Sequence, residues 1–150
     1  MSESTASRED PKPIATIARS YLDAFSRADP DEIADHVSPD FINEHTAALG
    51  SGCTGKDAYR ERLTGFLGDM VSLRYEVEGI LVEGDDAAAF YTMKAKWQGD
   101  APISVRGVMR LRAADGLLTH RTDYWDSAVF LTQVSNEARE ALAPFGVTTS

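Results

Sequence analysis

The chain has 150 residues, 43% of them hydrophobic and 26% charged, which is enough to bury the core of one globular domain. Its net charge of −9 argues against nucleic-acid binding, because such binding needs a basic surface that displaces counterions from phosphates. No apolar run approaches the length of a membrane span, so we expect neither a membrane nor a nucleic acid as partner and place the protein in the cytoplasm.

The first half of the chain predicts helices. Apolar residues recur at helical spacing in three segments, which predicts helices over residues 14–28, 30–37 and 55–69. Val37 belongs to the apolar face of the second helix, which Ser38 and Pro39 end. Thr54 and Asp57 have the spacing of a capping box at the start of the third helix.

The second half of the chain predicts a sheet. After a short strand over residues 40–45, the hydrophobic period changes to two near Leu73, and further strands are predicted over residues 87–98, 103–112 and 117–126. The turns between these strands are short, so neighbouring strands must be antiparallel, and the helices must cover one face. Irregular chain ending in a helix is expected over residues 130–142. The sequence therefore predicts one α+β domain at residues 14–143, between tails at residues 1–13 and 144–150.

Four short segments resemble one protein family. They are Asp-Phe-Ile-Asn-Glu-His at residues 40–45, Gly-Lys-Asp-Ala-Tyr at 55–59, Val-Glu-Gly-Asp-Asp at 82–86 and Asp-Tyr-Trp-Asp at 123–126. Together they resemble the SnoaL-like polyketide cyclases of the nuclear transport factor 2-like superfamily, which also holds ketosteroid isomerases and limonene epoxide hydrolases. The resemblance spans roughly residues 14–133, nearly the whole predicted domain, and it is evidence for a fold more than for a reaction.

The resemblance implies a cone, in which a strongly curved antiparallel sheet wraps around helices and encloses an apolar pocket. It also implies a homodimer that pairs through the sheet, a hydrophobic small molecule as ligand, and chemistry that needs neither a metal nor an organic cofactor. Strand alternation indicates which side chains share the inner face and are candidates for ligand binding: Tyr91, Met93, Trp97, Val105, Met109 and Trp125.

Asp123 and His45 are the candidate catalytic residues. Asp123 shares the parity of the inner face, and the resemblance places it where cyclases and epoxide hydrolases carry a catalytic acid. The alternative is a structural carboxylate that pairs with Arg121 or Arg106. His45 matches the position of the catalytic base in ketosteroid isomerases, and a histidine titrates near neutral pH. Its alternative is a hydrogen-bonded residue of the pocket wall.

Two further polar residues are candidates for binding the substrate. Asn43 lies on the face of His45 and could orient water or a carbonyl, although an amide bonded to the backbone is the simpler interpretation. Tyr21 corresponds to the tyrosine that donates to the oxyanion in ketosteroid isomerases, but its helical spacing also fits a core residue. The glycines of residues 47–55 predict a loop at the mouth of the pocket.

The sequence also departs from both enzyme types. Met93 and Ala95 stand where epoxide hydrolases carry an arginine and an aspartate, and Gly107 and Val108 stand near the acidic oxyanion donor of ketosteroid isomerases. Two hypotheses follow. The first is an acid/base enzyme without a cofactor, of isomerase, cyclase or hydrolase type, acting on a hydrophobic cyclic carbonyl or polyketide-like substrate. The second is a ligand-binding or dimerisation module without turnover.

Overall fold

The structure is a computed structural model that describes residues 12–148, so most of the predicted tail at residues 1–13 and residues 149–150 lie outside the described part. Its helices are α2 (Ile14–Ala24), α3 (Pro30–Ala34), α4 (Lys56–Asp69), α5 (Ser127–Val134) and α6 (Asn136–Leu142), with 3₁₀ turns at Phe25–Arg27 and Ala143–Phe145. Its strands are β1 (Val37–His45), β2 (Cys53–Thr54), β3 (Met70–Glu83), β4 (Asp86–Trp97), β5 (Ala101–Ala114) and β6 (Leu117–Trp125).

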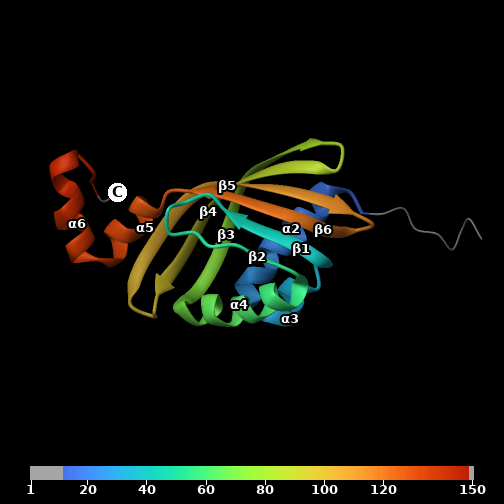
Figure 1. Cartoon of the computed structure of the whole chain (residues 1–150), viewed down its shortest axis with the longest axis horizontal. Helices are drawn as coiled ribbons and strands as arrows, with labels where there is room; N and C mark the ends of the chain where they lie inside the picture. The colour runs from blue at the N-terminus through green and yellow to red at the C-terminus, as the bar shows by residue number, and fades with distance from the viewer. Residues whose placement is uncertain (1–11, 149–150) are drawn as a thin grey trace, which may run out of the picture.

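The strands form one curved, unclosed sheet in the order β2-β1-β6-β5-β4-β3 (Figure 1). The strands from β3 to β6 pair with their chain neighbours and are antiparallel, as the turns predict. β1 instead pairs with β6 in parallel, which sets His45 opposite Asp123 and Asn43 opposite Arg121. The predicted α+β class is confirmed. The sheet departs from the predicted antiparallel pairing at this one pair, which sets β1 beside the last strand of the chain, β6.

The helices lie in two groups in Figure 1, with α2, α3 and α4 along one side of the sheet and α5 and α6 extending from its far end. The buried face of α2 packs on the sheet through aromatic contacts. The ring of Phe25, just after α2, meets Tyr75 of β3 edge-on with centroids 5.0 Å apart, and Tyr75 meets Tyr91 of β4 at 5.1 Å. This aromatic row fixes the helix against the strands that line the site.

Two local predictions are wrong. Val37 begins β1 and pairs with Leu118, because a single buried apolar residue fits the end of a helix and the start of a strand equally well. The capping box does not form either. Thr54 pairs with Ile42 in β2, and Gly55 is the N-cap of α4, with a positive φ of 97° and no side-chain cap.

The end of the chain is more regular than expected. α5 begins directly after β6, where the side chain of Asp126 accepts from the backbone N–H of Ala128. Gln133 of α5 bonds both backbone groups of Ser104, at 2.7 and 2.8 Å, and so fastens α5 to β5. No helix within residues 12–148 has the length and the apolar character that a membrane span requires.

Candidate active site

A cavity of about 590 Å³ opens between the inner face of the sheet, α4, α5 and the loop at residues 46–52. Its volume is in the range of small-molecule sites. Its lining comprises His45, Leu49, Gly50, Ser51, Arg62, Phe66, Met70, Tyr75, Tyr91, Met93, Trp97, Val105, Arg121, Asp123, Trp125 and Phe130. Most of these side chains are apolar or aromatic.

The aromatic wall of the cavity is held by edge-to-face contacts. Phe130 of α5 meets Trp97 with ring centroids 5.1 Å apart and Trp125 at 6.4 Å. Such contacts add to the free energy gained from burial alone and fix ring orientation. The position of α5 therefore determines where this wall ends.

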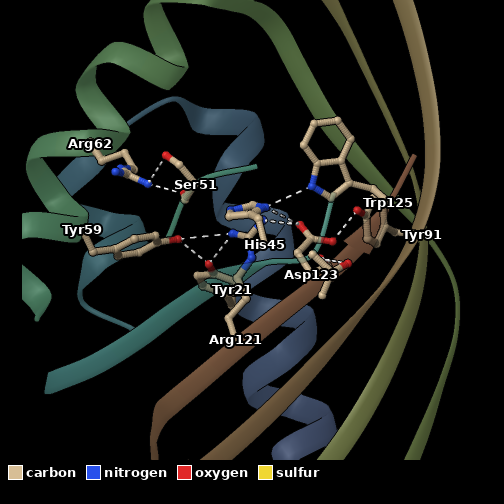
Figure 2. Close-up of polar contacts among 10 residues, drawn as sticks. Tyr21, His45, Ser51, Tyr59, Arg62, Tyr91, Arg121, Asp123 and Trp125 are labelled. Carbon is tan, nitrogen blue, oxygen red and sulfur yellow. Dashed lines mark hydrogen bonds and ion pairs between the residues drawn. The ribbon is translucent and has the colours of Figure 1, made fainter. Parts of the chain in front are cut away.

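The polar part of the cavity is centred on Asp123, which is 3% exposed. Arg121 Nη2 donates to Asp123 Oδ2 at 2.7 Å, and the hydroxyl of Tyr91 donates to Oδ1 at 2.6 Å (Figure 2). Burial, reinforced by the charge of Asp123, raises the pKa of Tyr91 well above its usual value, so this hydroxyl remains a donor. Asp123 is thus a buried carboxylate with a partner on each oxygen.

Arg121 is positioned from its other side by two tyrosines. Its Nη1 donates to the hydroxyl of Tyr21 of α2 at 2.8 Å, and the hydroxyls of Tyr21 and Tyr59 of α4 share a short hydrogen bond. The guanidinium also lies over the rings of Tyr21 and Phe25, 5.9 and 5.8 Å from their centroids. Helices α2 and α4 thereby each supply a tyrosine that fixes the position of the Arg121 guanidinium, which Asp123 faces.

His45 lies at the end of β1, opposite Asp123 of β6. Its Nδ1 accepts from Trp125 Nε1 at 3.1 Å, which requires an unprotonated Nδ1 and therefore places the ring proton on Nε2. Burial and the positive charge of Arg121 are the main causes that lower the pKa of His45 to about 4, against the opposing charge of Asp123. His45 Nδ1 lies 3.9 Å from Asp123 Oδ2, too far for a hydrogen bond. His45 is therefore a neutral imidazole at physiological pH.

The cavity reaches solvent beside α4 and the loop at residues 46–52, because Leu49, Ser51 and Arg62 line it and are exposed. Nη1 of Arg62 donates to the backbone carbonyl of Ser51 and, at 3.1 Å, to its Oγ. A Cβ added at Gly50 would lie 2.4 Å from the Cβ of His45, so only glycine allows the loop to pack this closely on the histidine. The predicted loop at the pocket mouth is therefore confirmed in position, since Gly50 and Ser51 line the cavity.

Comparison with known proteins identifies the family. The model of the SnoaL-like domain matches residues 18–121, more than half of the chain. The chain belongs to the SnoaL-like domain family. No curated protein matches its sequence.

Several solved structures resemble this SnoaL-like domain. A hypothetical protein with a ketosteroid isomerase-like fold from Catenulispora acidiphila DSM 44928, in complex with trimethylamine, has 18% identity and a TM-score of 0.72 over 78% of this chain and 90% of that chain. A protein assigned as a SnoaL-like polyketide cyclase from Jannaschia sp. CCS1 has 17% identity and a TM-score of 0.72, over 86% and 99%. An LEH-like epoxide hydrolase from M. tuberculosis has 18% identity and a TM-score of 0.67, over 76% and 83%. At such identities the likeness establishes the fold alone.

The SnoaL-like domain brings most of the predicted site residues together. The cavity lining includes both candidate catalytic residues and five of the candidate binding residues: Asp123, His45, Tyr91, Met93, Trp97, Val105 and Trp125. Three others lie outside the lining. Tyr21 is buried and bonds Arg121, Met109 is fully buried in the core, and Asn43 is 4% exposed, with no partner for its Oδ1 among the described residues.

Several residues of the site were not singled out by the sequence pattern. Arg62 and Phe130 of the lining, and Tyr59, which bonds Tyr21, lie on helices whose packing against the sheet the pattern does not specify. Tyr75 lies on β3, for which strand alternation assigned no residues to the inner face. Arg121 appeared only as a structural partner of Asp123, and that pairing is present. The signal that could have found it as part of the site is its parity, since it shares the inner face of β6 with Asp123. Among residues 12–148, no group of three acidic, His or Cys side chains could hold a metal ion.

Proposed function

We propose that this protein is a small-molecule enzyme that moves a proton next to a carbonyl group of a hydrophobic, cyclic or polyketide-like substrate, without a cofactor. The observation that carries the proposal is one cavity in which the carboxylate of Asp123 and the neutral imidazole of His45 lie on neighbouring strands inside an apolar wall. A base and a hydrogen-bond donor so placed are what enolisation needs.

His45 is suited to be the donor. Because Trp125 occupies Nδ1, the ring carries its proton on Nε2, and no described residue bonds that atom. A neutral imidazole can polarise a substrate carbonyl without becoming a competing acid. In this mechanism Nε2–H donates to the carbonyl oxygen, and the hydrogen bond strengthens as negative charge develops there.

Asp123 is suited to be the base. Its carboxylate accepts one hydrogen bond on each oxygen and retains lone pairs for a substrate proton. It takes the proton from the carbon beside the carbonyl and leaves an enolate whose oxygen accepts from His45 Nε2–H. The same carboxyl group then returns the proton to another carbon in an isomerisation. In a cyclisation the enolate carbon adds to a second carbonyl carbon of the substrate, whose C=O π bond opens to an alkoxide, and that oxygen takes the proton from Asp123.

Deuterium exchange tests this step without knowledge of the product. The protein is incubated in D₂O with apolar cyclic ketones such as 2-tetralone and a 3-keto-steroid, and deuterium beside the carbonyl is measured by mass spectrometry. We expect exchange above the buffer rate for wild type and for Glu44→Gln, because Glu44 is an exposed carboxylate bonded to Thr122 outside the cavity. We expect Asp123→Asn to abolish exchange and still to bind the ketone.

A second candidate function is ligand binding without turnover. The observation that favours it is the pair of bonds that already occupies both oxygens of Asp123. Ketones that bind wild type but never exchange deuterium would support this module and contradict the enzyme. Failure of every ketone to bind would contradict both candidate functions.

We further propose that the protein is a homodimer that pairs through the outer face of the sheet. Phe90, Val108 and Tyr124 are register partners across β4, β5 and β6, and Phe90 and Tyr124 are partly exposed on that face. Light scattering of wild type and of Phe90→Glu would test it. A monomeric wild type would contradict the proposal.

A further inference from the structure

The cavity has an unbalanced positive charge. Three charged side chains line it, Arg62, Arg121 and Asp123, whereas His45 is neutral. Arg121 and Asp123 pair with each other at 2.7 Å and are both buried. The charge of Arg62 is therefore left without a counterpart in the lining, in a chain whose net charge is −9.

Some N–H groups of the Arg62 guanidinium have no partner among the described residues. Its Nη1 contacts Ser51, but no carboxylate lies within salt-bridge distance of it in the described part of the chain. Arg60, on the same helix, is different, since its Nε pairs with Asp31. A guanidinium has five N–H groups in a planar fork, and those of Nη2 and Nε bond no residue among 12–148. Arg62 is thus free to pair with a ligand.

The charge of Arg62 reaches His45. It is the smallest of the causes that lower the pKa of His45, after burial and the charge of Arg121. Figure 2 places Arg62 and Ser51 to one side of the His45 ring, and Asp123 and Trp125 to the other. A ligand between these two sides would present one end to Arg62 and its reacting part to His45 and Asp123.

We propose that the pocket selects apolar ring compounds that carry a carboxylate or another acidic oxygen, and that this group pairs with Arg62 at the mouth of the cavity. The inference rests on the proposed function of the pocket and adds the class of substrate. The acidic oxygen accepts from the unused N–H groups of Arg62, while the apolar rings lie against Met93, Val105 and the tryptophans. The remaining surface charge of the chain does not prevent this, because salt screens exposed charges beyond about 8 Å at physiological ionic strength.

The test uses a matched pair of probes that differ in charge and hardly in shape, 2-naphthoate and 2-naphthamide. Affinities are measured by calorimetry at pH 7.5 and low salt for wild type, Arg62→Gln, Arg62→Lys and Arg60→Gln. Arg60→Gln is the matched control, since Arg60 lies on the same helix, outside the cavity lining, and pairs with Asp31.

We expect wild type and Arg60→Gln to bind the naphthoate at least about tenfold more tightly than the amide, the ratio that a charge-assisted hydrogen bond supplies. Arg62→Gln should lose that preference, with unchanged affinity for the amide showing that the pocket is intact. Arg62→Lys should retain part of the preference, and added salt should reduce it.

Two results would overturn the inference. Equal affinities of the two probes for wild type would do so, as would a preference for the naphthoate that survives in Arg62→Gln. In both cases binding of the amide would leave the proposed pocket standing, so this failure is distinct from failure of the proposed function. Binding of neither probe would overturn the inference together with the pocket on which it rests.

Discussion

Arg121 and Asp123 lie two residues apart on β6, and Arg121 Nη2 donates to Asp123 Oδ2 at 2.7 Å, with 5% and 4% of the two side chains exposed. Alternate residues of a strand share a face, so the strand itself sets this pair side by side. A buried charge without its counterpart is costly, and each of the two therefore depends on the other to remain in the core. Asp123, the candidate catalytic residue, is therefore also one half of a buried ion pair that stabilises the fold.

This dependence predicts coupled stability effects. Asp123→Leu leaves the charge of Arg121 buried and unpaired, so we expect the free energy of unfolding to fall by about 3–5 kcal/mol, and Arg121→Met to have a similar effect. In the double variant no buried charge remains, and we expect at least half of the summed loss to be recovered. Urea denaturation of the four proteins measures it. Losses that simply add would mean that the two side chains stabilise the fold independently.

Much of the cavity wall could be predicted from the sequence because strands have a period of two. Met93, Val105 and Trp125 were placed on the inner face by parity alone, and all three line the cavity. Parity does not show, however, how far along the inner face of the sheet the cavity extends. Met109 shares the face of Val105 but lies where helices fill the interior, and so it is a core residue.

The polar centre could not be read from periodicity because it depends on tertiary contacts. Tyr21 and Tyr59 come from helices α2 and α4, and the short bond between their hydroxyls requires one particular packing of those helices. His45 meets Trp125 only because β1 pairs with β6 in parallel, which no turn between consecutive strands specifies. Amphipathic patterns give the buried face of each helix, but not its neighbours.

Gly107 is predicted to tolerate no side chain without a loss of stability. A Cβ at this position would lie 2.5 Å from the hydroxyl of Tyr91 and 2.7 Å from the backbone oxygen of Tyr124, so the absent side chain makes room for the bond from Tyr91 to Asp123. We expect Gly107→Ala to lower the free energy of unfolding by about 1–3 kcal/mol through overpacking and to weaken ligand binding.

Gly79→Ala is the control for this substitution. Gly79 is also in a strand, but a Cβ there would meet no atom within 4 Å. We expect it to be neutral or slightly stabilising, because alanine has fewer unfolded conformations to lose than glycine. Thermal denaturation and calorimetric titration of both variants provide the measurement. Equal effects of the two substitutions would show that the space beside Tyr91 is not limiting.

The hydroxyl of Tyr21 is predicted to stabilise the fold through Arg121. Tyr21→Phe removes the acceptor that lies 2.8 Å from Arg121 Nη1, and the remaining tyrosine, Tyr59, is 3.5 Å from that nitrogen. We expect a loss of about 1–3 kcal/mol in the free energy of unfolding, since a charged donor is left poorly paired in the core. Thr16→Val, which removes the hydroxyl of an exposed residue on the same helix, should change it by less than about 0.5 kcal/mol. A loss in Tyr21→Phe no larger than in this control would exclude the predicted role.

The lowered pKa of His45 leads to a prediction of how the free energy of unfolding depends on pH. Its pKa is about 4 in the folded protein, where burial and the charge of Arg121 disfavour the imidazolium, against an ordinary value of 6.5. The unfolded chain therefore binds a proton at His45 at a higher pH than the folded chain does. The contribution of His45 to the free energy of unfolding is fully present above pH 6.5 and is lost as the pH decreases toward 4. The shift corresponds to a loss on the order of 3 kcal/mol across this window.

The measurement compares the free energy of unfolding of wild type and His45→Gln between pH 7 and pH 4. Glutamine preserves an acceptor for Trp125 Nε1 but does not titrate, so the variant should lose less stability over this window. His120→Gln, which alters a histidine outside the cavity lining, should follow wild type. An NMR titration that finds the imidazole of His45 half-protonated near pH 6.5 would contradict the prediction. It would also remove the reason for treating Nε2 as a neutral donor to the substrate, because His45 would then carry charge close to physiological pH.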